Sequence, residues 1–159
     1  MKIRPIELKD NKSLAKAIRS VLIEMGVPKV GTAYEDKELD AMFETYQSSR
    51  SQYFIIEYRG EILGGAGIAP LKDGDHSVCE LQKMYFLKEA RGKGLGYKMI
   101  KLCLAFARSA SFKLCYIETM PNMQKAQKLY KKVGFSYIDH PMGNTGHCSC
   151  PIWMTKVLV

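Results

Sequence analysis

A glycine-rich segment at 91–96 constrains this 159-residue chain more than any other feature of its sequence. It reads Arg91-Gly92-Lys93-Gly94-Leu95-Gly96 and stands between a strand-like run and a strongly amphipathic helical pattern. Unpaired backbone N–H groups converge at a helix N-terminus, and glycine lets that backbone approach an anion closely. The segment therefore predicts an anion site, and the charges of Arg91, Lys93 and Lys98 suit a diphosphate.

The spacing of these glycines excludes two other phosphate-binding loops. A Walker A loop requires Gly-x4-Gly-Lys-Ser/Thr, which the sequence lacks. A dinucleotide fingerprint requires G-x-G-x-x-G, whereas the glycines here fall at 92, 94 and 96. For the segment alone, the remaining alternative is a helix that simply begins after a flexible glycine turn.

Periodicity predicts the elements that precede this segment. In chain order they are a strand at 3–6, a helix capped by Asp10 and ended by Gly26, a loop at 27–34, a helix at 39–46 after an acidic first turn, and a hairpin of strands 53–58 and 61–70. The next strand, 78–87, has apolar Leu81 and Met84 three positions apart, a spacing that strict alternation places on opposite faces. A β-bulge between them would restore the phase.

The elements after the glycine segment complete one α/β domain over residues 1–159. They are a helix at 95–110, a strand at 114–119, a helix at 123–133 ended by Gly134, and strands at 135–138 and 152–158. No internal repeat, linker or low-complexity tract divides the chain.

Charge and cysteine content limit the partners and the compartment. The net charge of +8 is uneven: residues 1–80 hold 11 basic and 13 acidic side chains, and residues 81–159 hold 13 and 3. Such asymmetry implies a polyanionic partner, which could be nucleic acid, an anionic membrane or a phosphorylated cofactor. Five scattered cysteines form no disulfide framework, and three of them (Cys79, Cys103 and Cys115) fall on predicted core elements, where thiols are inert. With no apolar run long enough for a membrane span and no signal-peptide pattern, we expect a cytoplasmic protein.

Three linked motifs resemble those of the GNAT acetyltransferase superfamily. Arg91-x-x-Gly94-x-Gly96 matches its Q/R-x-x-G-x-G/A signature, 80–86 is similar to its bulged fourth strand, and Leu129-Tyr130 with Gly134-Phe135 is similar to its LY-x-x-x-GF ending. The resemblance is close over 78–138 and otherwise rests on element order. It implies a three-layer fold with a mixed, mostly antiparallel sheet, a bulged fourth strand and about four helices. It also implies acetyl transfer from acetyl-CoA to a primary amine of a small molecule or peptide, by direct attack and without a metal.

The resemblance also implies a set of cofactor-binding residues. The pyrophosphate would lie on the backbone of 91–96, the pantetheine arm would run along 84–86, and N–H groups freed by the bulge would hold the thioester carbonyl. The implied residues are Met84, Tyr85, Phe86, Arg91, Gly92, Lys93, Gly94, Leu95, Gly96 and Asn122. Many relatives carry an asparagine seven positions before the tyrosine, where this chain has Met123 with Asn122 beside it.

Three residues are candidates for proton transfer under the same resemblance. Tyr130 would protonate the departing thiolate, its alternative being an ordinary core tyrosine. Glu80 would be the general base, acting directly or through water, unless it is a solvated strand-end carboxylate. Glu118, on the neighbouring strand, is the rival base.

Two features leave alternatives open. The segment 143–150 would form a loop beside the acceptor pocket, a surface turn, or a metal site at His147, Cys148 and Cys150, although these ligands are too few for a closed zinc site. The lysines Lys125, Lys128, Lys131 and Lys132 could serve a nucleic-acid-binding module, and a non-catalytic acyl-CoA-binding module is the other rival. The expected partners are acetyl-CoA and a small amine, with no membrane and no nucleic acid, and a homodimer is left open.

Overall fold

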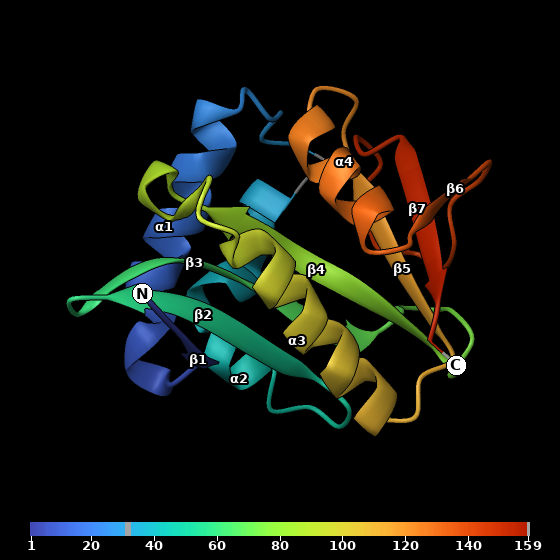
Figure 1. Cartoon of the computed structure of the whole chain (residues 1–159), viewed down its shortest axis with the longest axis horizontal. Coiled ribbons are helices and arrows are strands. Elements are labelled where there is room, and N and C mark those ends of the chain that lie inside the picture. The colour runs from blue at the N-terminus through green and yellow to red at the C-terminus, as the bar shows by residue number, and fades with distance from the viewer. Residues whose placement is uncertain (31–32, 159) are drawn as a thin grey trace.

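The computed structural model describes residues 1–30 and 33–158, which form one mixed sheet with helices on both faces (Figure 1). The strands are β1 (Lys2–Pro5), β2 (Gln52–Tyr58), β3 (Glu61–Pro70), β4 (Val78–Phe86), β5 (Leu114–Thr119), β6 (Ser136–Ile138) and β7 (Ile152–Val157). The α-helices are α1 (Asn11–Glu24), α2 (Met42–Thr45), α3 (Leu95–Ser109) and α4 (Gln124–Lys132). In the described chain the sheet order is β1-β2-β3-β4-β5-β7-β6, and only the β4–β5 pair is parallel. The predicted fold class is confirmed.

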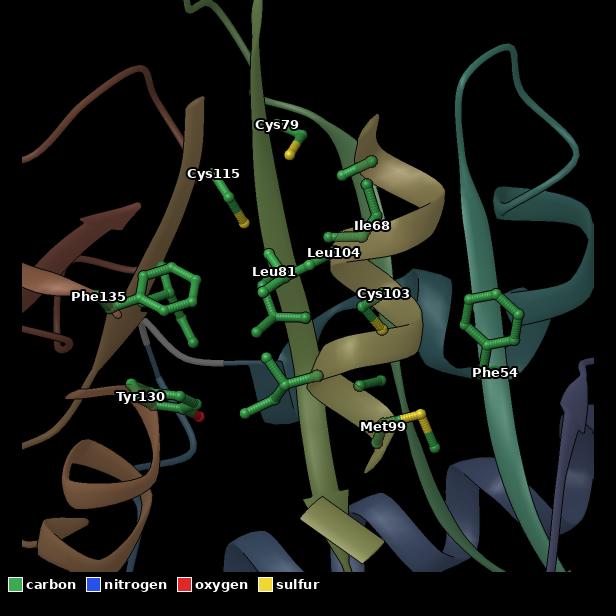
Figure 2. Close-up of a cluster of buried hydrophobic side chains, with 14 of the residues drawn as sticks. Phe54, Ile68, Cys79, Leu81, Met99, Cys103, Leu104, Cys115, Tyr130 and Phe135 are labelled. Carbon is green, nitrogen blue, oxygen red and sulfur yellow. The ribbon is translucent and has the colours of Figure 1, made fainter. Parts of the chain in front are cut away.

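Alternating side chains of the sheet build a core on each of its faces. In β2, Tyr53 and Ile55 point toward α1 and α2, whereas Phe54 and Ile56 point toward α3. The apolar positions of α1 recur at helical spacing, so Leu14, Ile18 and other residues of that face are fully buried on the first side. Met99 and Cys103 of α3 and Tyr130 of α4 belong to the core on the second side (Figure 2).

The predicted bulge is present in β4. Gly65 of β3 pairs with Tyr85 and Gly67 with Gln82, so the single residue Ala66 faces both Lys83 and Met84. Lys83 has a φ of 49°, in the left-handed region. The extra residue restores the phase of the strand, because Leu81 and Met84 now contact the same apolar cluster.

The parallel strands β4 and β5 separate partway along their length. Their pairing covers only Val78–Glu80 of β4, opposite Leu114, Cys115 and Tyr116. Beyond this point β4 stays with β3, while β5 stays with β7 as far as Thr119. Figure 1 shows the two strands diverging toward the end of the molecule where α4 lies. This divergence opens the sheet beside the bulge.

The region before β2 differs from the prediction. The expected helix at 39–46 is instead the end of a 3-10 turn, Lys37–Ala41, followed by the single α-helical turn of α2, and another 3-10 turn, Ala33–Glu35, precedes both. The backbone of Ala41, at φ −135° and ψ 42°, is not helical and interrupts the hydrogen-bond repeat. Leu39, Met42 and Tyr46 are buried all the same, since 3-10 and α turns place them on the same side. The predicted loop 27–34 includes residues 31 and 32, which lie outside the described residues.

The start of α1 also corrects the sequence interpretation. Asp10 does not cap the helix through its side chain. Its carboxylate accepts hydrogen bonds from the Arg4 guanidinium at 2.7 and 3.0 Å and from the Glu7 N–H at 2.8 Å. The role of Asp10 is thus set by Arg4 on β1, and this pairing cannot be predicted from the local sequence pattern. Within the described ranges no helix is long and apolar enough to cross a membrane.

Candidate active site

The glycines before α3 serve two different physical purposes. Gly92 and Gly94 both have a φ of 72°, a conformation that side-chain-bearing residues rarely adopt, and a Cβ on either would meet no atom within 4 Å. Their role is therefore to set the backbone that leads into the helix. At Gly96 the constraint is proximity, because a Cβ there would lie 2.8 Å from Leu129 Cδ2. Gly96 thus allows α3 and α4 to approach each other.

A cavity of about 760 Å³ lies between the diverging strands, the start of α3 and the helix α4. Its volume is within the range of ligand pockets. Most of the predicted site residues line it: Met84, Tyr85, Phe86, Arg91, Gly92, Gly94, Gly96, Glu118, Asn122 and Tyr130. Three predicted site residues do not line the cavity: Lys93, Leu95 and Glu80. Lys93 and Leu95 instead line a smaller hollow with Met1 and Tyr58.

The end of α1 closes the cavity through contacts with two of its walls. The Arg91 guanidinium donates to the Phe86 carbonyl at 2.7 Å and pairs with both Glu24 oxygens at 2.9 and 3.0 Å. On the opposite wall, Asn122 Nδ2 donates to the Met25 carbonyl at 3.2 Å. Val21, Met25 and Val27 also line the cavity. Sequence reasoning did not place the end of α1 beside a cavity, because an apolar residue shows the same pattern in a core and at a cavity wall.

Two lysines of α4 line the cavity while staying exposed to solvent. Lys125 and Lys132 line it, and Lys132 Nζ lies 5.7 Å from the ring centroid of Tyr97, another lining residue. The sequence singled out these lysines for their charge but linked them to nucleic acid. Their position brings positive charge to the same opening as the N-terminus of α3.

Tyr130 lies at the boundary between the core and the cavity. Its side chain is only 4% exposed, and its ring packs against Phe135 with centroids 6.1 Å apart. Figure 2 shows the ring extending from α4 toward β4. Among the described residues no group forms a hydrogen bond with its hydroxyl, and burial raises the pKa of Tyr130 above its usual value. The hydroxyl therefore stays protonated at neutral pH.

Glu80 is buried behind the wall of the cavity and is held in a chain of hydrogen bonds. It is 4% exposed, and its Oε2 accepts a hydrogen bond from Gln82 Nε2 at 2.7 Å. Gln82 in turn accepts one from the Tyr46 hydroxyl at 2.7 Å. Burial raises the pKa of Glu80 to about 7, and the nearby Glu118 adds to the shift, while the Gln82 hydrogen bond opposes it. Such a carboxyl can take up and release a proton near neutral pH.

Both carboxylate oxygens of Glu118 are already occupied. Oε1 accepts from the Tyr116 hydroxyl at 2.7 Å, and Oε2 accepts from the Thr145 hydroxyl at 2.6 Å. Sequence reasoning missed Tyr116 and Thr145, because neither belongs to a motif and Thr145 lies 27 positions from its partner. Glu118 thus anchors the segment that carries Thr145.

The segment 142–150 lies against the sheet beside the two glutamates. The Met142 N–H donates to the Tyr116 hydroxyl at 3.2 Å, and His147 Nε2 lies 3.3 Å from Asp36 Oδ2. In the described chain, donor atoms of Glu80, Glu118 and His147 fall within 4.8 Å of one another. The metal hypothesis required His147 to lie with Cys148 and Cys150, but His147 lies beside carboxylates instead. Since its neighbours already form ion pairs and hydrogen bonds, we interpret the group as a charge network.

The cysteines differ in their surroundings. Cys79, Cys103 and Cys115 are buried, and burial raises the pKa of Cys103 and Cys115 far from neutrality. Cys148 is exposed, whereas Cys150 lines the cavity, where burial raises its pKa to about 11. At neutral pH the Cys150 thiol is therefore protonated, which makes it a poor nucleophile.

Comparison with known proteins yields a consistent assignment. The model of the acetyltransferase (GNAT) family matches residues 18–135. The chain is 41% identical over 157 residues to the uncharacterized N-acetyltransferase YjgM of Escherichia coli (strain K12), covering 98% of this chain and 94% of YjgM. A GNAT-family acetyltransferase structure from Staphylococcus aureus Mu50 is similar with a TM-score of 0.87 at 21% identity, over 99% of both chains. The Salmonella typhimurium yncA structure, solved with its cofactor acetyl-CoA, has a TM-score of 0.79 at 17% identity, over 100% of this chain and 94% of yncA.

These comparisons identify the chain as an acyltransferase. The chain belongs to the acetyltransferase (GNAT) family. The family predicted from three short motifs and the predicted enzyme class, N-acetyltransferase, are both confirmed.

Proposed function

We propose that residues 1–159 form a single catalytic domain that binds acetyl-CoA in the 760 Å³ cavity and transfers its acetyl group to a primary amine. One observation carries the proposal: the cavity runs from the left-handed glycines before α3 to the bulge of β4, where β5 has already separated. Its shape suits a long ligand with a phosphate end and a reactive end. The acetyl-CoA bound to yncA supports this choice of ligand.

In this proposal the backbone of 91–96 holds the pyrophosphate, and Lys125 and Lys132 add positive charge at the same opening. The pantetheine arm lies along 84–86, beside Asn122. At the bulge, backbone N–H groups that do not pair with β3 would bind the thioester carbonyl. Since that oxygen becomes an oxyanion during attack, each such donor typically lowers the barrier by about 3 kcal/mol.

The proposed reaction moves two protons. Glu80 removes one from the acceptor ammonium through a water molecule, because Glu80 is buried behind the cavity wall. The free amine attacks the thioester carbon, the C–S bond breaks, and Tyr130 protonates the departing thiolate. The second nitrogen proton then restores Tyr130, so the products are an amide, coenzyme A and one proton for the solvent. Glu118 is the weaker candidate for base, since both its oxygens accept hydrogen bonds.

A panel of primary amines assayed for thiol release from acetyl-CoA tests the activity itself. Release that depends on an amine is the expected result. If coenzyme A binds but no amine, small or peptidic, promotes release, the chain is an acyl-CoA-binding module and the proposed reaction is wrong. Metal independence and a cytoplasmic location stay predictions.

The choice of base is tested by comparing Glu80→Gln with Glu118→Gln. Because the proposed role of Glu80 is to deprotonate an ammonium, its loss should depress turnover mainly at neutral pH. Activity should recover partly in alkali, where more of the acceptor is already a free amine. The Glu118 variant should lose less. A larger pH-dependent loss in that variant would reverse the assignment.

A further inference from the structure

Charged groups of alternating sign form a chain beside the part of the cavity that Lys83 and Glu118 line. Lys83 Nζ lies 3.2 Å from Asp36 Oδ2, which lies 3.3 Å from His147 Nε2. His147 Nδ1 then lies 3.7 Å from Glu118 Oε2. The Lys83, His147 and Glu118 side chains are only 4%, 17% and 6% exposed, so water screens these interactions weakly.

His147 occupies the centre of this network, and each element packed against it contributes charge. The titratable groups that act on His147 directly are Asp36 of the segment before α2, Glu80 and Lys83 of β4, and Glu118 of β5. Those partners in turn interact with Glu38, Tyr85, Tyr116 and Cys150. Carboxylates outnumber the single lysine. The hydrogen bond with Asp36 raises the pKa of His147, with the charges of Asp36 and Glu80 acting in the same direction.

Asp36 shows the reciprocal effect. Burial alone would raise the pKa of Asp36, but the hydrogen bond with His147 and the charge of Lys83 outweigh burial and hold that pKa below its usual value. An ionised Asp36 and a protonated His147 therefore stabilise each other. The imidazolium lies within 4.8 Å of the Glu80 carboxylate, although 67 positions separate the two residues in the chain.

We propose that His147 is a positioning residue for Glu80: its imidazolium, anchored by Asp36 and Glu118, keeps the buried Glu80 carboxylate ionised and able to accept a proton. This inference rests on the proposed function, in which Glu80 is the base. It assigns a purpose to the segment 142–150, which carries this cation to the site. Thr145 attaches the segment to Glu118 through a neutral hydroxyl, and His147 adds the charge.

The coupling can be measured without any turnover. The chain has three histidines, so ring NMR signals can be followed against pH and the His147 signal identified by its loss in His147→Gln. We expect His147 to titrate above the ordinary histidine value, and Glu80→Gln and Asp36→Asn each to lower its midpoint by about 1 unit. An unchanged midpoint in Glu80→Gln would show that the two groups do not interact and would overturn the inference.

The catalytic consequence is tested by the pH dependence of kcat/KM. His147→Gln should move the acid limb of the profile upward by about 1 unit, since Glu80 then becomes protonated more readily. Thr145→Val is the matched control, because it removes a neutral contact to the same Glu118. It should raise KM for the amine without moving the acid limb. Equal shifts in the two variants would mean that His147 acts only by holding the segment.

Two further measurements test the inference if His147→Gln does not fold or if no amine is acetylated. If His147→Gln does not fold, Asp36→Asn should move the acid limb in the same direction, because it removes the anion that keeps His147 protonated. An unmoved limb there contradicts the inference. If the wild-type enzyme acetylates no amine, the proposed function fails, whereas the NMR titration still decides whether His147 and Glu80 are coupled.

Discussion

The Tyr130 side chain belongs to the apolar core and also lines the cavity. Among the described residues its hydroxyl has no hydrogen-bond partner, so Tyr130→Phe should leave the melting temperature almost unchanged. Because the proposed acid contributes only after the thiolate begins to leave, turnover should fall ~10²–10⁴-fold at constant KM for acetyl-CoA. Melting temperature and steady-state kinetics on one preparation check this. If the variant instead keeps full turnover but its free energy of unfolding falls by ~1–3 kcal/mol, Tyr130 is a structural residue.

The buried Glu80 should lower the stability of the fold at the pH where it is ionised and can act as a base. Its pKa is raised from 4.5 to about 7, so the folded state binds more protons than the unfolded chain across this window. The stabilisation of the fold by protonated Glu80 is fully present below pH 4.5 and is lost as the pH rises through about 7. Glu80→Gln, which is neutral throughout, should thus raise the melting temperature relative to wild type more at pH 8 than at pH 5. In free energy of unfolding, the gain of the variant over wild type should be larger at pH 8 than at pH 5 by on the order of 2 kcal/mol.

Asp10→Asn provides a control of opposite sign for this measurement. Burial opposes the shift, but hydrogen bonds from Arg4 and from the Glu7 N–H hold the pKa of Asp10 below its usual value of 3.8. Asp10 therefore stabilises the fold above pH 3.8, and that stability is lost as the pH falls. Its replacement should destabilise the protein at neutral pH. If both variants shifted melting in the same direction at pH 8, electrostatics could not be the cause.

At the scale of elements, the glycine loop before α3 should decide cofactor binding. Coenzyme A should raise the melting temperature by mass action. Gly94→Glu should abolish that rise, because it distorts the backbone that presents the N–H groups and adds an anion beside them. Gly60→Glu is the matched control, since Gly60 has a φ of 82°, equally open surroundings and a position in the β2–β3 turn. A full coenzyme A shift in the Gly94 variant would exclude this loop as the phosphate site.

At the scale of the whole molecule, three segments distant in sequence should respond together to coenzyme A. The end of α1 contacts Arg91 on one wall of the cavity and Asn122 on the other. Amide hydrogen exchange should therefore slow on binding at 21–27, 91–97 and 120–123, and stay unchanged in β1. Mass spectrometry of peptides with and without coenzyme A measures this. Protection confined to 91–97 would show that α1 does not take part in binding.

Features that depend only on neighbouring residues could be predicted from the amino-acid pattern. The bulge follows from the phase of Leu81 and Met84, and the left-handed turn before α3 follows from glycine, because backbone sterics act over a few positions. The same local rules predicted most strands, α1, α3 and α4. They failed at α2, where the apolar spacing of Leu39, Met42 and Tyr46 fits a 3-10 turn and an α-helix alike.

Which distant side chains meet depends on how the whole chain folds. The contact of His147 with Asp36 joins residues 111 positions apart, and that of Arg91 with Glu24 joins residues 67 apart. The sequence shows charge but not pairing, because a carboxylate on a solvated face and one buried beside an imidazolium have the same local pattern. Burial sets the pKa of Glu80, and it depends on residues distant in sequence, since Glu118 and His147 lie beside it. Local chemistry therefore predicted the elements and the bulge, and the resemblance to a known family implied the fold, whereas the electrostatics of the site required the distances between atoms that folding brings together.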